Sequence, residues 1–220
     1  MLRLGHKYNF ATYREEAVSR LQDAFGPDWE TVIVNETGDI NTDRIYMDEA
    51  HSWSDVINLA YDLRLERTLP LVYFNAIAHK YYPAYLFNGT KSEDGTLSKV
   101  HPSIRQHLLC SQDLLFLEMR RTCFSWMFDE SVEPLLGGVC TGRRSACLTA
   151  LVTAIGKIFT PKQRINYGLA VWDENFVPGL CKSCSRAAEK SFEEGRDILW
   201  GKLPVIFGMK PWDSLKDFDL

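Results

Sequence analysis

Apolar residues return every three or four positions in several separate segments of this 220-residue chain, and this spacing constrains the fold more than any other feature. The clearest segment is 143–159, whose apolar stripe consists of Cys147, Leu151, Ala154, Ile155 and Ile158. Such spacing places side chains on one face of an α-helix, whereas a half-buried strand needs alternation with a period of two. No convincing period-two series is present, and the short candidates for strands are 31–34 and 84–87.

Capping and breaking residues divide the chain into separate helices. Thr12 and Glu15 fit a capping box at the start of the first helix, and Gly26-Pro27 ends it. The segment 71–82 is apolar nearly all round, which is typical of a central helix. We expect helices over about 12–25, 52–63, 68–82, 102–128, 143–159 and 182–202. The predicted fold class is therefore all-α: an irregular multi-helix bundle with at most a few very short strands.

The most loop-like stretch of the chain is 88–100, which is rich in Gly, Ser, Thr and charged residues. We expect this stretch to divide two helical subdomains, an N-terminal one over 1–88 and a C-terminal one over 101–220. Hydrophobic residues make up 45% of the chain and charged residues 25%, so the composition is that of an ordinary globular protein with enough length to bury a core.

The net charge and the hydropathy of the chain limit the classes of partner that it is expected to bind. The net charge of −4 argues against a phosphate-binding surface as the main purpose, so no nucleic-acid partner is expected. No apolar run approaches the roughly 20 residues that span a bilayer, so no membrane partner is expected. The first residues contain no apolar signal core, and we therefore expect an intracellular protein of the cytoplasm or nucleus.

The six cysteines contain one constellation with chemical meaning. Cys181 and Cys184 have the C-x-x-C spacing of a zinc knuckle, and they lie at the predicted start of a helix, which favours thiolates. Cys140 and Cys147 form a second pair, separated by six residues, which precedes or opens another helix. Together these four residues can supply the sulfur ligands of one closed, structural zinc site.

Two other interpretations of the same four cysteines remain open. All four can be small buried hydrophobic residues, since free cysteine is among the most buried residue types, and this packing interpretation is preferred on the sequence alone. Cys181 and Cys184 can also be a redox dithiol, although the strand–helix context of thioredoxin-like folds is missing. The cofactor expectation is therefore either none or one structural zinc.

Known enzyme signatures are missing from the chain. It has no glycine-rich phosphate loop, no Gly-x-Ser-x-Gly elbow and no His-Glu-x-x-His motif. His79 and His107 are the candidates for a base in an unfamiliar helical active site, but a histidine on an apolar helix more often lies at the edge of the core. We predict no catalytic residue and no enzyme activity.

Three stretches of the chain resemble a known family. Residues 2–8 read LRLGHKY and residues 69–74 read LPLVYF. The third and most specific stretch contains Gly179-Leu180-Cys181, Cys184, Gly195-Arg196, Leu199-Trp200, Leu203-Pro204, Phe207-Gly208 and Pro211-Trp212. In this order and spacing they resemble the region that follows the BTB/POZ domain in a large family of proteins from mushroom-forming basidiomycete fungi.

The resemblance implies a helical region that is distantly like the BACK helices of other BTB proteins. Proteins of that family are usually adaptors that bring partners together, and some recruit substrates to cullin ubiquitin ligases. The resemblance therefore implies a non-catalytic protein–protein interaction domain whose partners are other proteins. The BTB fold itself would lie upstream of Met1, so a link to cullin ligases is expected only through that missing fold.

Overall fold

Helices dominate the computed structural model, which describes residues 8, 10–28, 45, 53–79, 82, 84–91, 95–128, 140–159 and 168–217. The helices are α2 (Ala11–Phe25), α4 (Trp53–Asp62), α5 (Leu69–Ala78), α6 (Ala84–Asn88), α7 (Pro102–Arg121), α8 (Ser125–Phe128), α10 (Arg144–Phe159) and α11 (Lys182–Ile206). Two short strands, β1 (Thr90–Lys91) and β2 (Leu97–Ser98), pair antiparallel. The prediction of an all-α fold with very short strands is confirmed. None of the described helices is long and apolar enough to cross a membrane.

Several predicted element boundaries differ from the observed ones. Residues 84–87, a strand candidate, belong to α6, where Tyr85 and Leu86 are buried one after the other without the alternation of a half-buried strand. The residue that caps α2 is Phe10, without a side-chain hydrogen bond, so the predicted capping box does not form the cap. The predicted helix over 102–128 is two helices, α7 and α8, separated by a turn. The other strand candidate, 31–34, lies outside the described residues.

The described residues form two compact units, and the division differs from the predicted one. Unit 1 contains the described residues up to Gln112 and those from Leu203 onward, and unit 2 contains the described residues between Asp113 and Lys202. The stretch 88–100 therefore lies within unit 1 and does not separate the units. Within it, Thr90 and Lys91 of β1 pair with Ser98 and Leu97 of β2. The Asn58 side chain forms hydrogen bonds with the backbone of Lys99 and His101 at 2.9 and 3.1 Å.

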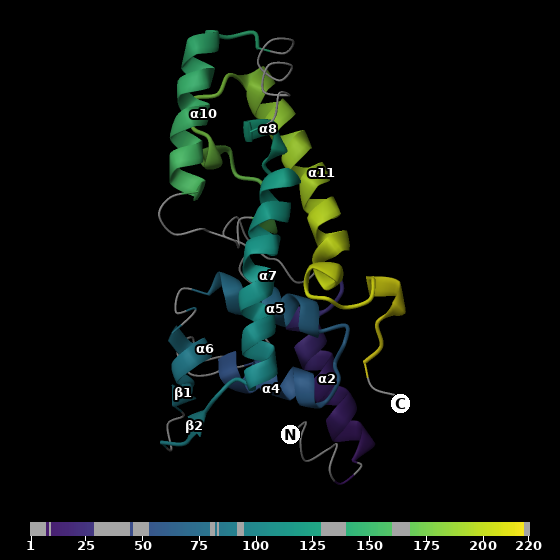
Figure 1. The fold of residues 1–220 in the computed structure, drawn as a ribbon. Coiled ribbons are helices and arrows are strands. Elements are labelled where there is room, and N and C mark those ends of the chain that lie inside the picture. Colours follow the sequence, from purple (N-terminus) through teal and green to yellow (C-terminus); the bar gives the residue numbers. More distant parts are fainter. Residues whose placement is uncertain are drawn as a thin grey trace. The chain divides into compact units, whose positions relative to one another are not determined.

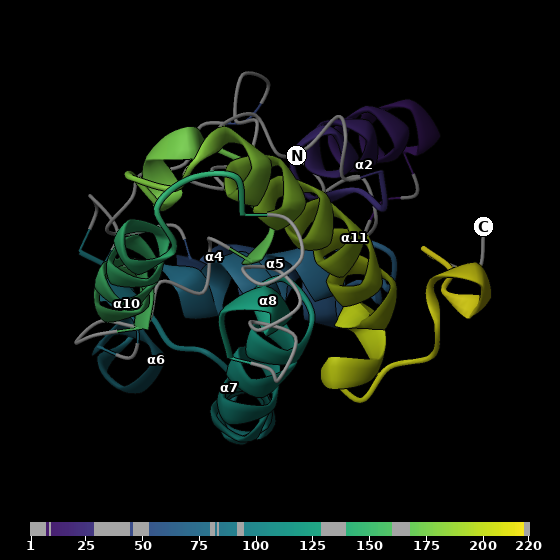
Figure 2. The same cartoon turned by 90° about the horizontal axis from the view of Figure 1, so that it is seen from above.

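The core of unit 1 is built around α5. Leu71, Val72 and Phe74 have no exposed surface, as the apolar sequence of this helix predicts for a central element. Helix α4 packs beside it (Figures 1 and 2). The carboxylate of Asp217, near the C-terminus, accepts hydrogen bonds from the Arg67 amide at 2.7 Å and from the Gln22 side chain at 2.8 Å, so residues far apart in sequence meet in this unit.

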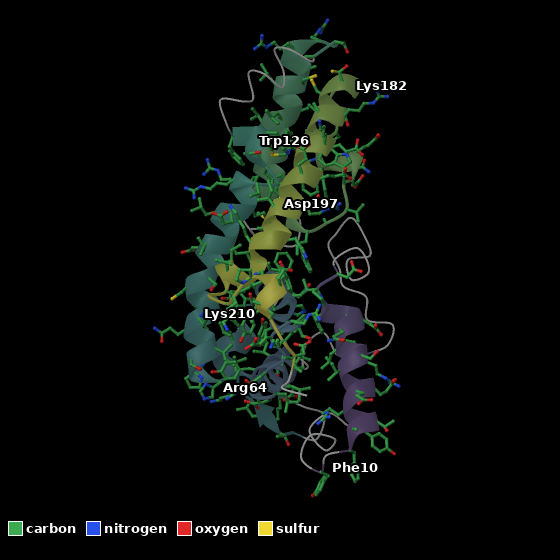
Figure 3. All side chains as sticks on the ribbon, turned by 90° about the vertical axis from the view of Figure 1, so that its right-hand side faces the viewer. Phe10, Arg64, Trp126, Lys182, Asp197 and Lys210 are labelled. Carbon is green, nitrogen blue, oxygen red and sulfur yellow. The ribbon has the colours of Figure 1, made fainter. Side chains whose placement is uncertain are left out.

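The core of unit 2 is aromatic and centres on Phe192 of α11. Its ring centroid lies 5.4 Å from that of Phe124, 5.5 Å from that of Trp172 and 5.8 Å from that of Phe176. Phe192 belongs to a stripe on α11 without exposed surface, formed by Cys184, Ala188, Phe192 and Leu199. Figure 3 follows this helix from Lys182 past Asp197. Burial of this stripe holds the first turn of α11 in place.

A close approach between α11 and the turn after α7 depends on Gly195. A Cβ atom added to Gly195 would lie 2.3 Å from the carbonyl oxygen of Thr122, far inside van der Waals contact. The next residue, Arg196, is buried, and its guanidinium donates a hydrogen bond to the carbonyl oxygen of Ala170 at 2.8 Å. The Gly195-Arg196 pair therefore joins α11 to two other backbone segments of unit 2.

This close approach predicts opposite effects for two glycine substitutions on the same helix. We expect Gly195→Ala to lower the free energy of unfolding by about 1–3 kcal/mol, because the added methyl group forces α11 away from Thr122. Gly201 has no atom within 4 Å of an added Cβ, so Gly201→Ala should raise that free energy by about 0.5–1 kcal/mol through helix propensity. Urea denaturation followed by circular dichroism measures both, and equal shifts for the two variants would contradict the close approach.

Candidate metal centre

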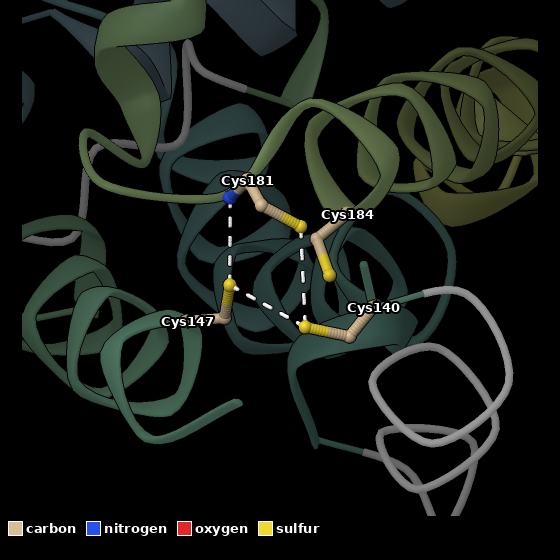
Figure 4. Close-up of side chains that lie close together, drawn as sticks. All are labelled: Cys140, Cys147, Cys181 and Cys184. Atoms are coloured by element: carbon tan, nitrogen blue, oxygen red, sulfur yellow. Dashed lines mark hydrogen bonds between the residues drawn. The ribbon is translucent and has the colours of Figure 1, made fainter. Parts of the chain in front are cut away.

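The four cysteines of the centre come from two helix starts and from the residues just before them. Cys147 lies in the first turn of α10 and Cys184 in the first turn of α11, and both belong to the buried stripes of these helices. Cys140 and Cys181 precede the two helices and are partly exposed. Figure 4 shows the four side chains pointing toward one another.

The sulfur atoms are spaced as a tetrahedral metal ion requires. The Sγ atoms of Cys140 and Cys147 lie 3.8 Å apart, and those of Cys140 and Cys181 lie 3.9 Å apart. All four Sγ atoms lie within 4.8 Å of one another. A tetrahedron with metal–sulfur bonds of about 2.3 Å has edges of about 3.8 Å between its sulfur atoms. The four cysteines can therefore hold a metal ion of this size.

Hydrogen bonds to sulfur favour negative charge at the centre. The backbone amide of Cys181 donates to the Sγ atom of Cys147 at 3.4 Å. Donation from the backbone amide of Cys184, together with smaller contributions from the Cys184 thiol and the Gly142 amide, lowers the pKa of Cys181 to about 6. These hydrogen bonds outweigh the opposing effect of burial on Cys181 and favour its thiolate, which is the form that binds a metal.

Burial acts in the opposite direction on the two inner cysteines. It raises the pKa of Cys184 and of Cys147 above the ordinary value, because a thiolate is poorly solvated where no water reaches it. Four thiolates this close together would also repel one another. A divalent cation removes both penalties, since a thiol that coordinates a metal ion is deprotonated outright.

The N-terminal ends of α10 and α11 bring positive charge to the four cysteines. A helix N-terminus usually attracts acidic side chains, but neither α10 nor α11 has an acidic residue in its first turn. Exposed Arg143, Arg144 and Lys182 stand at these two helix starts instead. The positive helix ends and the basic side chains would partly balance the charge of −2 that four thiolates and one divalent ion carry together.

Two further contacts belong to the centre and were not found by sequence reasoning. A Cβ atom on Gly142 would lie 2.7 Å from the Cβ atom of Cys181, so only glycine permits the observed approach of these two segments. The hydroxyl groups of Thr141 and Ser183 form a hydrogen bond of 2.8 Å between the same segments. The sequence signal that could have identified Gly142 is its place two positions after Cys140, because a turn that supplies a metal ligand often needs glycine.

The remaining candidate residues lie elsewhere. Cys110 is exposed, and Cys123 is buried with its thiol donating to the Gly168 carbonyl oxygen at 3.1 Å. The two candidate bases lie in unit 1, where the His79 ring packs 5.4 Å from Trp53 and the His107 ring 6.1 Å from Tyr73. Within the described ranges, the four cysteines are the one group of three or more Cys, His, Asp or Glu side chains that converge as metal ligands do.

Comparisons of the chain with models of protein families, with curated proteins and with solved structures find no match. The chemistry of the centre therefore follows from its donor atoms. Four sulfur donors suit soft or borderline ions such as zinc, whereas magnesium and calcium prefer oxygen. Packing alone accounts well for buried Cys147 and Cys184, but it gives no reason for partly exposed Cys140 and Cys181 to point at them.

The contact between Gly142 and Cys181 predicts a specific loss of metal affinity. We expect Gly142→Ala to weaken binding about 10–100-fold, because the added methyl group displaces the Cys181 thiolate. Gly156 in α10 has nothing within 4 Å of an added Cβ, so Gly156→Ala is the matched control and should bind as the original chain does. Titration with Co²⁺, followed by its thiolate charge-transfer absorption, measures both affinities. Unchanged affinity in Gly142→Ala would contradict the role of this glycine.

Proposed function

We propose that this chain is a zinc-stabilised helical domain in which Cys140, Cys147, Cys181 and Cys184 bind one structural Zn²⁺. The observation that carries the proposal is the convergence of the four sulfur atoms within 4.8 Å of one another. We propose with it that the domain serves in protein–protein association and not in catalysis, as the resemblance to the region after a BTB/POZ domain implies.

The donor set indicates the role of the ion. Four cysteine thiolates complete a tetrahedral shell around zinc, whereas catalytic zinc sites keep one position open for water or substrate. The ligands would join the residues around Cys140, the first turn of α10 and the first turn of α11. Because an unfolded chain does not hold the four sulfur atoms together, the free energy of zinc binding contributes to the stability of the folded chain.

Elemental analysis of protein purified without added zinc tests the metal directly, and we expect about one zinc per chain. Cys184→Ala should lose the zinc and melt at a clearly lower temperature. Cys123 is equally buried, with no exposed surface, so Cys123→Ala is the matched control for the loss of a buried thiol. It should keep the zinc and lose only the stability that belongs to packing.

The packing interpretation makes the opposite prediction for this pair of variants. Protein that contains no zinc, together with equal losses of melting temperature in Cys184→Ala and Cys123→Ala, would contradict the zinc centre. A strong chelator provides a second readout. It should lower the melting temperature of the original chain and leave that of Cys184→Ala unchanged.

The outer face of α10 favours the association role. Leu148 and Val152 are 40% and 67% exposed, and no charged side chain lies between Arg144 and Lys157 on this helix. The hydroxyl groups of Thr149 and Thr153 on the same face donate to carbonyl oxygens of their own helix at 3.0 and 2.8 Å, which reduces the polarity of the surface. An uncharged helix face of this kind suits another protein better than water.

Affinity purification followed by mass spectrometry tests the association role. Proteins that co-purify with the original chain should be lost from a variant with Leu148→Asp and Val152→Asp, because burying two carboxylates in an interface is costly. Ile198 on α11 is also exposed, at 51%, so Ile198→Asp controls for added surface charge. Retention of the same partners by the double variant would contradict a role for this face.

A further inference from the structure

Exposure divides the four sulfur ligands into two pairs. Cys147 and Cys184 have at most 1% of their surface exposed. Cys140 and Cys181 are partly exposed, so a small reagent that arrives from solvent meets these two residues first. The inner pair is thereby protected by the same burial that packs α10 and α11 into unit 2.

The two outer cysteines also lie before the first turns of α10 and α11, whereas the two inner ones lie within those turns. The Sγ atoms of Cys140 and Cys181 lie 3.9 Å apart, so a disulfide bond of about 2.05 Å needs an approach of about 2 Å. Both residues precede their helices, whereas Cys147 is held in α10, where its amide donates to the Arg143 carbonyl oxygen. The Thr141–Ser183 hydrogen bond keeps the two outer segments together while the sulfur atoms approach.

We propose that the metal centre is a redox switch in which a hydroperoxide oxidises Cys140 and Cys181 to a disulfide and thereby releases the metal ion. The proposal rests on the zinc centre proposed above and adds its regulation. It assigns the four ligands different roles: the outer pair reacts, and the inner pair remains as thiols.

The reaction balances as a two-electron oxidation. One outer thiolate attacks the terminal oxygen of the hydroperoxide, the O–O bond breaks, and the departing alkoxide or hydroxide takes up a proton. The second thiolate attacks the resulting sulfenic sulfur, the S–S bond forms, and hydroxide leaves and takes up a second proton as water. Two thiolates, one hydroperoxide and two protons thus become one disulfide, one alcohol or water, and one water. The two electrons come from the sulfur atoms of Cys140 and Cys181, and the two remaining thiols, Cys147 and Cys184, would hold a zinc ion only weakly.

Reduction of the Cys140–Cys181 disulfide would restore the four thiols of the centre. A Cys140–Cys181 disulfide would join two of the segments that the metal ion would join. Reduction by a dithiol would return both thiolates beside Cys147 and Cys184. Oxidation would therefore replace a cross-link through the metal ion by a disulfide bond, and the segments that carry Cys140 and Cys181 would stay joined.

Tryptic peptide mapping of the zinc-loaded full chain tests this assignment. Cleavage after arginine and lysine places the four ligands on separate peptides, which are 122–143, 145–157, 165–182 and 183–186. The zinc content of the protein is measured first. Hydrogen peroxide is then added, and a chromogenic chelator reports the zinc that is released. Free thiols are blocked before the protein is digested. We expect zinc release together with a disulfide between 122–143 and 165–182. Because 122–143 also contains Cys123, the experiment uses the Cys123→Ala background.

Two results would overturn the switch: zinc retained at peroxide concentrations that oxidise exposed Cys110, or a first disulfide that contains Cys147 or Cys184. Recovery of zinc binding after treatment with dithiothreitol supports it. Cys140→Ser should abolish the 122–143 to 165–182 linkage. If the starting protein contains no zinc, the proposed metal centre fails, and peroxide treatment of the same metal-free thiols still shows whether Cys140 and Cys181 pair first.

Discussion

The packing of unit 2 and the placement of Cys184 depend on the burial of one stripe of side chains on α11. Phe192 packs among three aromatic rings, and Cys184 lies on the same stripe two helical steps earlier, with Ala188 between them. Residues four apart share a helix face, so the packing that buries Phe192 also directs the Cys184 thiol inward. Gly195 lets the helix approach the Thr122 backbone. A cavity-forming change in this stripe would therefore disturb the metal centre without touching a ligand.

The chemistry of the centre comes from a contrast between its two halves. The inner thiols are packed and poorly solvated, and burial raises the pKa of Cys184. The outer thiols are partly exposed, and hydrogen bonds from backbone amides lower the pKa of Cys181 to about 6. In the proposed metal centre, the buried inner pair would hold the ion in place, while the accessible outer pair would leave the complex open to oxidation. Stable binding and sensitivity to oxidants are therefore compatible in one small site.

Local sequence signals predicted the helices well because a helix depends mostly on nearby residues. The starts of α10 and α11 fall within one residue of their predicted positions. The errors occur where distant contacts decide the structure. Residues 84–88 form a helix despite their bulky apolar sequence, and the loop-like stretch 88–100 is held within unit 1 by the side chain of Asn58. A division into units depends on which helices pack together, which composition does not reveal.

The sequence by itself determined the all-α class, most helix starts and the four cysteines that can act as ligands, because periodicity and the C-x-x-C spacing are local properties of the chain. It could not choose between a metal centre and four buried thiols, because Cys147 and Cys181 are 34 positions apart and their distance depends on packing. Only the tertiary structure brought the four sulfur atoms within 4.8 Å, revealed the contact of Gly142 with Cys181 and separated an exposed pair from a buried one. These are relations between two helix starts, and they exist only after the apolar stripes of both helices are buried.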